Sequence, residues 1–398
     1  QMNEPKLRFP EFKDIWNNHK IEDMFDRVGT PVDLDDTLTY REIGIRSHGK
    51  GIFHKDETTA SEIGNKRIFW VEPDCFVVNI VFAWERAVAK TTEAENGMIA
   101  SHRFPMYKPK KDVVDLDYIT EYFITKRGQN VLILASPGGA GRNKTLGQKE
   151  FAKSVVKLPS LPEQQKIAEF LSTIDTVIAK QKETVSAWEE RKKGVMQKLF
   201  SQEVRFKADD GSDFPEWEKK PFGDIVSEFK VKTKVDNEDT LLSCAISGVF
   251  LNSELFGHQR GQSNIGYLKI KKGTLILSAQ NLHLGNANVN LRFEHGIISP
   301  AYKTYDIVGC SAEYMSQWVK WDMTKQFFYN ATTVGASECR RNVDWNMLYS
   351  QLFAVPCLEE QQKIADCLSS LDEVIEKQKA TLAAWEELKK GLLQQMFV

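Results

Sequence analysis

The sequence predicts an α+β protein built from two copies of one unit, each a strand-rich globular segment followed by a long coiled-coil helix. Residues 161–200 and 358–397 share 25 identities in 40 positions at a constant offset of 197. In both segments apolar residues recur at alternating spacings of four and three, which is typical of a coiled coil. The residues before each segment form short apolar runs between Gly, Pro and Asp breaks, which indicates strands.

The repeat predicts four domains in the order head, helix, head, helix, where a head is the globular segment of one copy. Their predicted bounds are residues 1–157, 158–202, 203–354 and 355–398. Arg8-Phe9, near the start of the chain, is echoed by Arg205-Phe206 near the start of the second copy. The helices are nearly identical but the heads have diverged, which indicates one task performed on two different targets.

The two predicted helices, residues 163–199 and 360–396, each carry an apolar seam that lasts about five heptads. Because such a helix is unstable until it buries its apolar stripe, we expect the two helices to pair with each other. The order of the domains favours antiparallel pairing about a pseudo-two-fold axis; the alternative is that each helix packs on its own head. The predicted interface residues are Ile167, Leu171, Ile174, Ile178, Gln181 and Trp188 in the first helix, and Ile364, Leu368, Leu371, Ile375, Gln378 and Trp385 in the second.

Gln181 and Gln378 interrupt this otherwise apolar seam. One interpretation is a register device, because a polar side chain on a seam rejects slipped pairings at a cost in stability. The other is a partly exposed edge of the seam, and the sequence does not distinguish the two. Within the heads, strands are predicted at 68–71, 75–81 and 273–277, and helices at 118–124 and 311–325.

Composition excludes several classes of protein. The formal net charge of −2 argues against a protein that coats DNA by bulk charge, although local basic patches remain compatible with it. No run approaches the ~18 apolar residues of a membrane span, so no membrane association is expected. The six cysteines are scattered without a C-x-x-C pair, which predicts a reducing cytoplasmic environment and no metal site.

Motifs for catalysis are also missing. The loop at 138–145 is similar to a phosphate-binding loop, but Asn143 stands where a glycine should precede Lys144. Neither G-x-G-x-x-G nor H-E-x-x-H occurs, and the seven histidines lack metal-ligand spacing. We therefore expect no catalytic residue and no cofactor in this chain, and no methyltransferase, nuclease or ATPase activity from it alone.

Basic, Gly-containing loops precede both helices and are the main candidates for contact with DNA. Arg can hydrogen-bond guanine edges, Asn can bond adenine edges, and Lys can contact phosphates. An ordinary solvated loop is the alternative for each. The candidate DNA-binding residues are Arg142, Asn143 and Lys144 in the first copy, Arg340, Arg341 and Asn342 in the second, and, on weaker grounds, Arg260, Gln280 and Asn281.

The chain resembles a known family, the specificity subunits of type I restriction–modification enzymes. The resemblance spans the whole chain and rests on a motif that reads LPSLPEQQKIA at 158–168 and VPCLEEQQKIA at 355–365. Ile174-Asp175 and Leu371-Asp372 follow the two copies as in the family. Asn79, Ala83-Trp84-Glu85 and Gly97 are also similar to a common segment of the target-recognition domains, although Arg86 stands where the family has a glycine.

The resemblance implies that the two heads are target-recognition domains, each reading half of a bipartite, asymmetric site in double-stranded DNA. It implies a complex with two DNA-adenine methyltransferase subunits and two ATP-dependent restriction and translocation subunits. S-adenosylmethionine, ATP and magnesium would then belong to those partners. Two rival functions are a stand-alone DNA-modifying enzyme, which activity of this chain alone would establish, and a coiled-coil scaffold that binds only protein.

Overall fold

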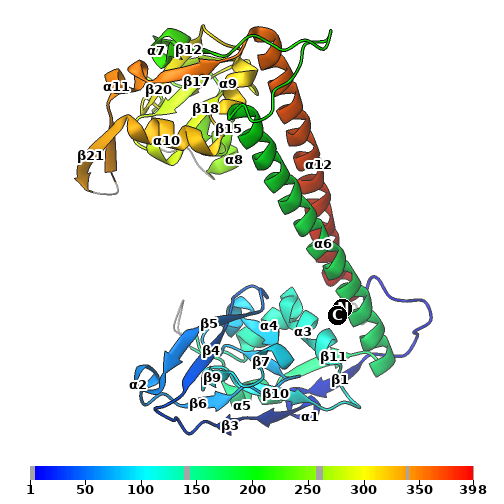
Figure 1. Cartoon of the computed structure of the whole chain (residues 1–398). Helices are drawn as coiled ribbons and strands as arrows, with labels where there is room; N and C mark the ends of the chain where they lie inside the picture. The colour runs from blue at the N-terminus through cyan, green and yellow to red at the C-terminus, as the bar shows by residue number, and fades with distance from the viewer. Residues whose placement is uncertain (1–4, 139–143, 257–262, 338–339, 398) are drawn as a thin grey trace. The chain divides into compact units, whose positions relative to one another are not determined.

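The computed structural model describes residues 5–138, 144–256, 263–337 and 340–397, and the chain folds as two compact units (Figure 1). Unit 1 comprises Gln1–Lys182 and Ala380–Val398, and unit 2 comprises Glu183–Lys379. The divisions fall inside the two long helices, α6 (Leu161–Phe200) and α12 (Leu358–Met396). Each unit therefore contains one head and a part of both helices.

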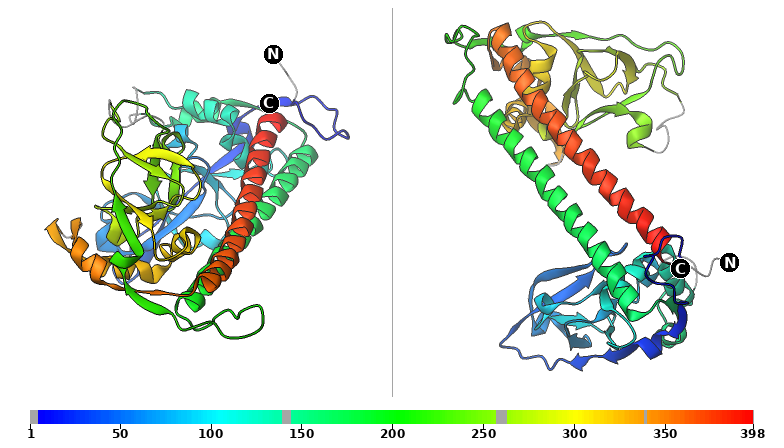
Figure 2. Two further views of the ribbon diagram at one scale, coloured as in Figure 1. Left: turned by 90° about the horizontal axis from the view of Figure 1, so that it is seen from above. Right: turned by 90° about the vertical axis from the view of Figure 1, so that its right-hand side faces the viewer.

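The two helices run antiparallel in each unit (Figure 2), and the ion pairs between them agree with this direction. In unit 1, Lys389 Nζ lies 2.8 Å from Asp175 Oδ2, and Lys182 Nζ lies 2.9 Å from Glu386 Oε1. The partner number falls in α12 as it rises in α6, so the chains point in opposite directions. In unit 2, Lys192 pairs with Asp372 and Glu189 with Lys379 in the same opposite sense. This confirms the predicted antiparallel coiled coil.

The predicted seam residues lie at several depths. In unit 1 the side chains of Ile167, Leu171, Ile174 and Ile178 are buried, and in unit 2 those of Ile364, Leu368 and Ile375 are buried. Five others are half-buried, namely Gln181, Trp188, Leu371, Gln378 and Trp385. Apart from Ile375, these buried residues belong to the same apolar clusters as the head residues, so the helices pack on the heads as well as on each other.

Both heads contain the same four-stranded antiparallel sheet. Its strand order is β2-β10-β7-β8 in unit 1 and β13-β20-β17-β18 in unit 2. In unit 1 the strands are β2 (Phe25–Val28), β7 (Phe76–Val78), β8 (Val88–Lys90) and β10 (Met106–Pro109). In unit 2 they are β13 (Val226–Phe229), β17 (Leu275–Ser278), β18 (Ala287–Val289) and β20 (Tyr302–Ile307).

A second strand pair closes each head next to its helix. β1 (Asn17–Lys20) pairs antiparallel with β11 (Val155–Leu158), and Asn17 lies opposite Leu158. β12 (Glu218–Pro221) pairs in the same way with β23 (Leu352–Val355). The chain therefore enters and leaves each head at one point, immediately before the long helix begins.

Short helices complete the part that the two heads share. In unit 1 they are α1 (Ile21–Met24), η1 (Ala83–Glu85), α3 (Leu116–Ile124), α4 (Lys126–Leu134) and α5 (Gln148–Lys153). In unit 2 the same places hold α7 (Phe222–Ile225), η4 (Leu282–Leu284), α9 (Ala312–Trp318), α10 (Asp322–Asn330) and α11 (Trp345–Ser350). The predicted continuous helix at 311–325 is therefore wrong: it is broken at Trp321, whose ψ of 136° is extended.

The heads differ in their remaining strands. Unit 1 has a five-stranded sheet of order β3-β6-β9-β4-β5, flanked by α2 (Ala60–Ile63) and η2 (Glu93–Glu95). Its strands are β3 (Thr30–Pro31), β4 (Thr39–Ile45), β5 (Ile52–Thr59), β6 (Ile68–Trp70) and β9 (Ile99–Ser101). Unit 2 has three two-stranded sheets and α8 (Asn252–Leu255). They pair β14 (Leu242–Ala245) with β15 (Gly248–Leu251), β16 (Leu268–Lys271) with β19 (His295–Ile298), and β21 (Thr332–Ser337) with β22 (Arg340–Val343).

The apolar core of unit 1 runs from the four-stranded sheet through α3 to the long helices. Phe76 of β7 packs on Phe123 of α3 with ring centroids 5.0 Å apart. On the other side of α3, Tyr118 packs on Phe397, which follows α12, also at 5.0 Å. Each buried aromatic side chain contributes about 1.5–3 kcal/mol. Among the described residues, no helix is long and apolar enough to cross a membrane.

Candidate nucleic-acid interface

The first candidate loop lies mostly outside the described residues. This applies to Arg142 and Asn143, and to Arg260 in the second head. Lys144 is described and half-buried. It lies just before Leu146, whose N–H donates to the carbonyl of Ile80 at 2.8 Å and so holds the end of the loop against the head.

The second candidate segment is a β-hairpin rather than the flexible loop that the sequence suggested. β21 and β22 pair antiparallel, with Arg341 opposite Val334 and Asn342 opposite Thr333. Thr332, Thr333 and Val334 are β-branched, which explains the strand. The side chain of Arg340 lies outside the described residues, although its backbone belongs to β22. A two-stranded ribbon has dimensions that the major groove of B-DNA admits.

The guanidinium of Arg341 is fixed at the base of this hairpin. Its Nε donates to Thr332 Oγ1 at 2.7 Å and its Nη2 donates to the Thr332 carbonyl at 3.1 Å. The same group lies over the Tyr329 ring, 4.0 Å from the centroid. The side chain of Arg341 therefore stabilises the hairpin, and its positive charge is held in a fixed orientation.

We expect Arg341→Ala to weaken the binding of target DNA by about 1–3 kcal/mol, because the hairpin loses both its charge and its support. Fluorescence anisotropy on the target duplex measures this. Arg341→Lys is the matched control, since it keeps the charge but loses the two-point grip on Thr332, and it should recover only part of the affinity. Unchanged affinity and unchanged site preference for both variants would show that the hairpin does not face DNA.

Gln280 and Asn281 lie where the chain leaves β17 and enters η4, and both side chains are exposed. The N–H of Asn281 donates to Ser278 Oγ at 3.2 Å, which fixes the turn. The equivalent positions in unit 1 are the apolar Val81 and Phe82. Side-chain amides, which suit adenine edges, are thus presented at this place by the second head alone.

A basic turn in unit 1 was not identified from the sequence. Between β4 and β5, Arg46, His48 and Lys50 are exposed on a tight turn. The turn is fixed because His48 N–H donates to the Glu85 carbonyl at 2.7 Å, and because a Cβ on Gly49, at φ +66°, would lie 2.8 Å from Ile124. The signal was the pattern R-S-H-G-K-G between two runs of alternating polarity. The turn is a further candidate for phosphate contacts.

The motif residues at the start of each long helix anchor that helix to its head. Glu163 of α6 has a fully buried side chain, and its carboxylate accepts hydrogen bonds from Arg8 Nε at 2.7 Å and Arg8 Nη2 at 2.8 Å. In unit 2, Arg205 donates to the buried carboxylate of Glu360 at 3.1 and 2.8 Å. The two arginines are those of the Arg-Phe echo, so the echo and the helix motif are partners in one ion pair.

The next motif residue, a buried glutamine, joins the helix to the neighbouring short helix. Gln164 Oε1 accepts the N–H of Asp115, the residue that caps α3, at 3.0 Å, and Nε2 donates to the Pro159 carbonyl at 3.0 Å. Gln361 makes the equivalent bonds with Ser311 N–H at 2.7 Å and the Pro356 carbonyl at 2.8 Å. Sequence reasoning missed these anchors, although Arg and Glu are 155 residues apart in both copies.

Further along the helices, a cluster of ion pairs in unit 1 recurs in unit 2 with one carboxylate replaced by an amide. Lys389 Nζ contacts both Asp175, at 2.8 Å, and Glu121 of α3, at 3.2 Å. Burial raises the pKa of the Glu121 carboxyl, and Lys389 offsets only part of that rise. In unit 2, Lys192 pairs with Asp372, and the position of Glu121 holds Gln317, whose Nε2 donates to Asp372 at 2.9 Å.

Replacing Glu121 with glutamine is expected to stabilise unit 1 at neutral pH. Because folding raises the pKa of Glu121, its ionised form destabilises the fold at high pH, and this effect disappears as pH falls towards the ordinary value of 4.5. The gain should be on the order of 1 kcal/mol above neutrality and should vanish near pH 4. Urea unfolding across this pH range tests it. A gain that is independent of pH would contradict the assignment, and Gln317→Glu in unit 2 should produce the opposite trend.

Metal coordination has no candidate in the part of the chain that the structure describes, since no three His, Cys, Asp or Glu side chains gather there. The buried titratable groups identified above serve as structural anchors. The arrangement is thus two heads on a shared scaffold, with exposed polar and basic groups on segments that differ between the heads.

Comparison with known proteins gives consistent findings. Residues 74–186 match the family of the type I restriction modification DNA specificity domain. The chain is 23% identical over 352 residues to the type I restriction enzyme MjaVIII specificity subunit of Methanocaldococcus jannaschii. The aligned region covers 83% of this chain and 80% of that protein.

Two solved structures share the fold at low sequence identity. The S subunit of a type I restriction-modification system from M. genitalium matches with a TM-score of 0.53 and 14% identity, covering 99% of both chains. A chain from a structure on complex assembly and conformational transition of the type I R-M system matches with a TM-score of 0.58 and 13% identity, covering 98% of this chain and 99% of that one.

Proposed function

Since this chain belongs to the type I restriction–modification specificity family, we propose that it reads DNA sequence on behalf of partner subunits. Each head reads one half of a bipartite, asymmetric site in double-stranded DNA, and the helix pair separates the two halves. The match of residues 74–186 to a DNA specificity domain carries this proposal. It is supported by a second head with the same four-stranded sheet and the same anchors but different exposed segments.

The chemistry belongs to partner subunits in this proposal. Two DNA-adenine methyltransferase subunits bind S-adenosylmethionine, and two restriction and translocation subunits use ATP and magnesium. This chain supplies no catalytic residue and directs methylation or restriction to the site that its heads select. The nine candidate residues named above contribute to that selection, with Arg341 and Asn342 on a ribbon of groove-compatible size.

The experiment is to express this chain with its methyltransferase subunit in a host that lacks adenine methylation, and to sequence the methylated adenines. We expect one motif with two specified halves and an unread gap. The chain alone and the methyltransferase alone are the controls, and both should leave the genome unmethylated. Methylation by the chain alone would establish a stand-alone enzyme. No motif with both subunits present would favour a scaffold that binds only protein.

The gap in this motif should depend on the length of the helix pair. One heptad added to each helix preserves the seam and lengthens each helix by about 10 Å. At about 3.4 Å per base pair, the preferred gap should grow by roughly 3 bp. Affinity should also fall, because at about 10.5 bp per turn the far half-site rotates around the duplex. A binding screen over gap lengths measures both. An unchanged preferred gap with full affinity would show that the helices do not set the spacing.

A further inference from the structure

A cavity lies in each unit between the head and the long helices. Its volume is about 720 Å³ in unit 1 and about 850 Å³ in unit 2. The helix residues that line the two cavities correspond through the repeat. Asp175, Lys182 and Lys390 line the cavity of unit 1, and their counterparts Asp372, Lys379 and Lys193 line that of unit 2. The same place in the fold therefore occurs twice, which permits a direct comparison.

The charges on the head side differ between the two cavities. In unit 2, α10 begins with Asp322, whose Oδ2 lies 3.1 Å from Lys193 Nζ. In unit 1, α4 begins at the equivalent position with Lys126, and Lys390, the counterpart of Lys193, pairs instead with Glu387 of its own helix, with Nζ 3.1 Å from Oε1. Six cationic side chains and two carboxylates line the cavity of unit 1, against four lysines and five carboxylates in unit 2.

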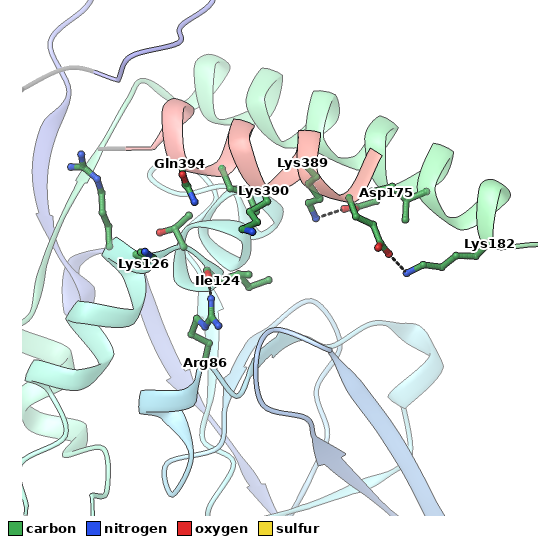
Figure 3. A pocket seen from close by; sticks show the side chains of 13 residues that line it. Arg86, Ile124, Lys126, Asp175, Lys182, Lys389, Lys390 and Gln394 are labelled. Atoms are coloured by element: carbon green, nitrogen blue, oxygen red, sulfur yellow. Dashed lines mark hydrogen bonds and ion pairs between the residues drawn. The ribbon is translucent and has the colours of Figure 1, made fainter. Parts of the chain in front are cut away.

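Arg86 adds to this difference. It stands at φ +61°, where unit 2 has Gly285 at φ +89°, so an arginine occupies a left-handed position that favours glycine. Figure 3 shows it reaching from the head towards the cavity, with Lys389 and Lys390 coming from α12. Arg86 Nη1 donates to the Ile124 carbonyl at 3.2 Å, and its buried Nε has no hydrogen-bond partner within the described ranges.

Half of the cations that line the cavity of unit 1, namely Arg86, Lys126 and Arg127, have no ion pair with a residue that the structure describes. The other three are paired: Lys182 with Glu386, Lys389 with Asp175 and Glu121, and Lys390 with Glu387. Lys126 and Arg127 are exposed and make no ion pair with any residue that the structure describes. The first turn of α4 also lacks the acid that α10 carries, so its positive helix end faces the cavity together with these side chains.

We propose that the cavity of unit 1 binds a phosphate group, whereas the cavity of unit 2 does not. Arginine and lysine side chains beside a helix N-terminus suit a tetrahedral, multiply charged oxyanion better than a singly charged carboxylate. The phosphate can belong to the DNA backbone or to a free polyphosphate. The site lies apart from base reading as far as the described residues go, because none of the candidate DNA-binding residues that the structure describes lines it.

The test uses the purified full chain and two probes, inorganic pyrophosphate and a random-sequence duplex. Pyrophosphate binding is measured by calorimetry, and duplex binding by anisotropy at several salt concentrations. Lys390→Ala is the variant and Lys193→Ala its matched control, since the repeat relates the two residues and their side chains are 64% and 61% exposed. Lys126→Asp, which copies the charge of unit 2, is the second variant. Unchanged urea unfolding of each variant guards against misfolding.

Lys390→Ala should weaken pyrophosphate binding about tenfold, Lys126→Asp should weaken it further, and Lys193→Ala should leave it unchanged. If the phosphate belongs to DNA, Lys390→Ala should also reduce the salt dependence of duplex binding by about one phosphate contact. An effect on pyrophosphate alone identifies a free phosphate ligand. No pyrophosphate binding, or equal effects of the two lysine variants, overturns the proposal. The proposal is also overturned if the variants change only the assembly with a protein partner, because the ligand of the cavity would then be an acidic protein segment.

The proposed function can fail separately. Pyrophosphate binding needs neither a target site nor a partner subunit, and the methylated motif is read without reference to this cavity. A chain that binds pyrophosphate but directs no methylation would support this inference and refute the proposed function. A chain that directs methylation to a bipartite site without binding pyrophosphate would support the proposed function and refute this inference.

Discussion

Replacing Arg8 with alanine is expected to lower the free energy of unfolding of unit 1 by about 3–5 kcal/mol, because it leaves the Glu163 carboxylate buried without its cation. Glu163 is fully buried, and both of its oxygens accept from Arg8 at 2.7 and 2.8 Å. Hydrogen exchange of the amides at the start of α6 measures the loss locally, and urea unfolding measures it for the whole chain.

The second copy and a rescue variant provide the controls. Arg205→Ala should cost less, since Glu360 also accepts from Trp217 Nε1 at 3.0 Å and so keeps one donor. Adding Glu163→Gln to Arg8→Ala should recover much of the stability, because the remaining side chain is then neutral. A loss below about 1 kcal/mol for Arg8→Ala, or no recovery in the double variant, would mean that the ion pair does not hold the helix to the head.

Exchanging the second head for a copy of the first is expected to convert the asymmetric target into an inverted repeat. The chimera replaces residues 218–355 with residues 17–158, so that β1 and β11 take the places of β12 and β23. The hydrogen bonds that hold α12 to the head are kept in the chimera. The backbone N–H of Asp115 can donate to Gln361 in place of the N–H of Ser311. The repeat becomes inverted because α6 and α12 run antiparallel.

The original site should be lost almost completely in this chimera. Each mismatched base pair costs about 1–3 kcal/mol, so three changed positions cost at least about 3 kcal/mol, or more than a hundredfold in affinity. Sequencing methylated adenines, with the methyltransferase present, reveals both the loss and the new motif. The reciprocal chimera, with residues 218–355 in place of 17–158, should give the inverted repeat of the other half-site. Continued methylation of the original site by either chimera would refute independent reading.

The helices could be predicted almost to the residue because a heptad pattern is local and was present twice. The predicted bounds 163–199 and 360–396 became Leu161–Phe200 and Leu358–Met396. The heads were harder, because turns within them depend on side-chain bonds. The predicted strand at 75–81 ends as β7 at Val78, since Asn79 Oδ1 accepts the Val81 N–H and turns the chain.

The functional surfaces were predicted less well than the scaffold, because they depend on residues that are distant in sequence. Arg341 was identified from a loop echo, but its grip on Thr332 and Tyr329 requires the hairpin. The Arg8–Glu163 anchor joins residues 155 apart and became visible only when the fold brought them together. The cavity of unit 1 combines groups from the first head, from α6 and from α12, so no local pattern could predict it.

The packing of Phe397 on Tyr118 has a consequence for the order of folding. Unit 2 is one continuous segment, Glu183–Lys379, whereas unit 1 needs Ala380–Val398 to complete its core. During synthesis, α3 of the first head therefore exposes Tyr118 until Ala380–Val398 has been made. Unit 2 can close while the chain is still being made, since domains fold as units when their residues are available. The head that leaves the ribosome first thus belongs to the unit that is completed last.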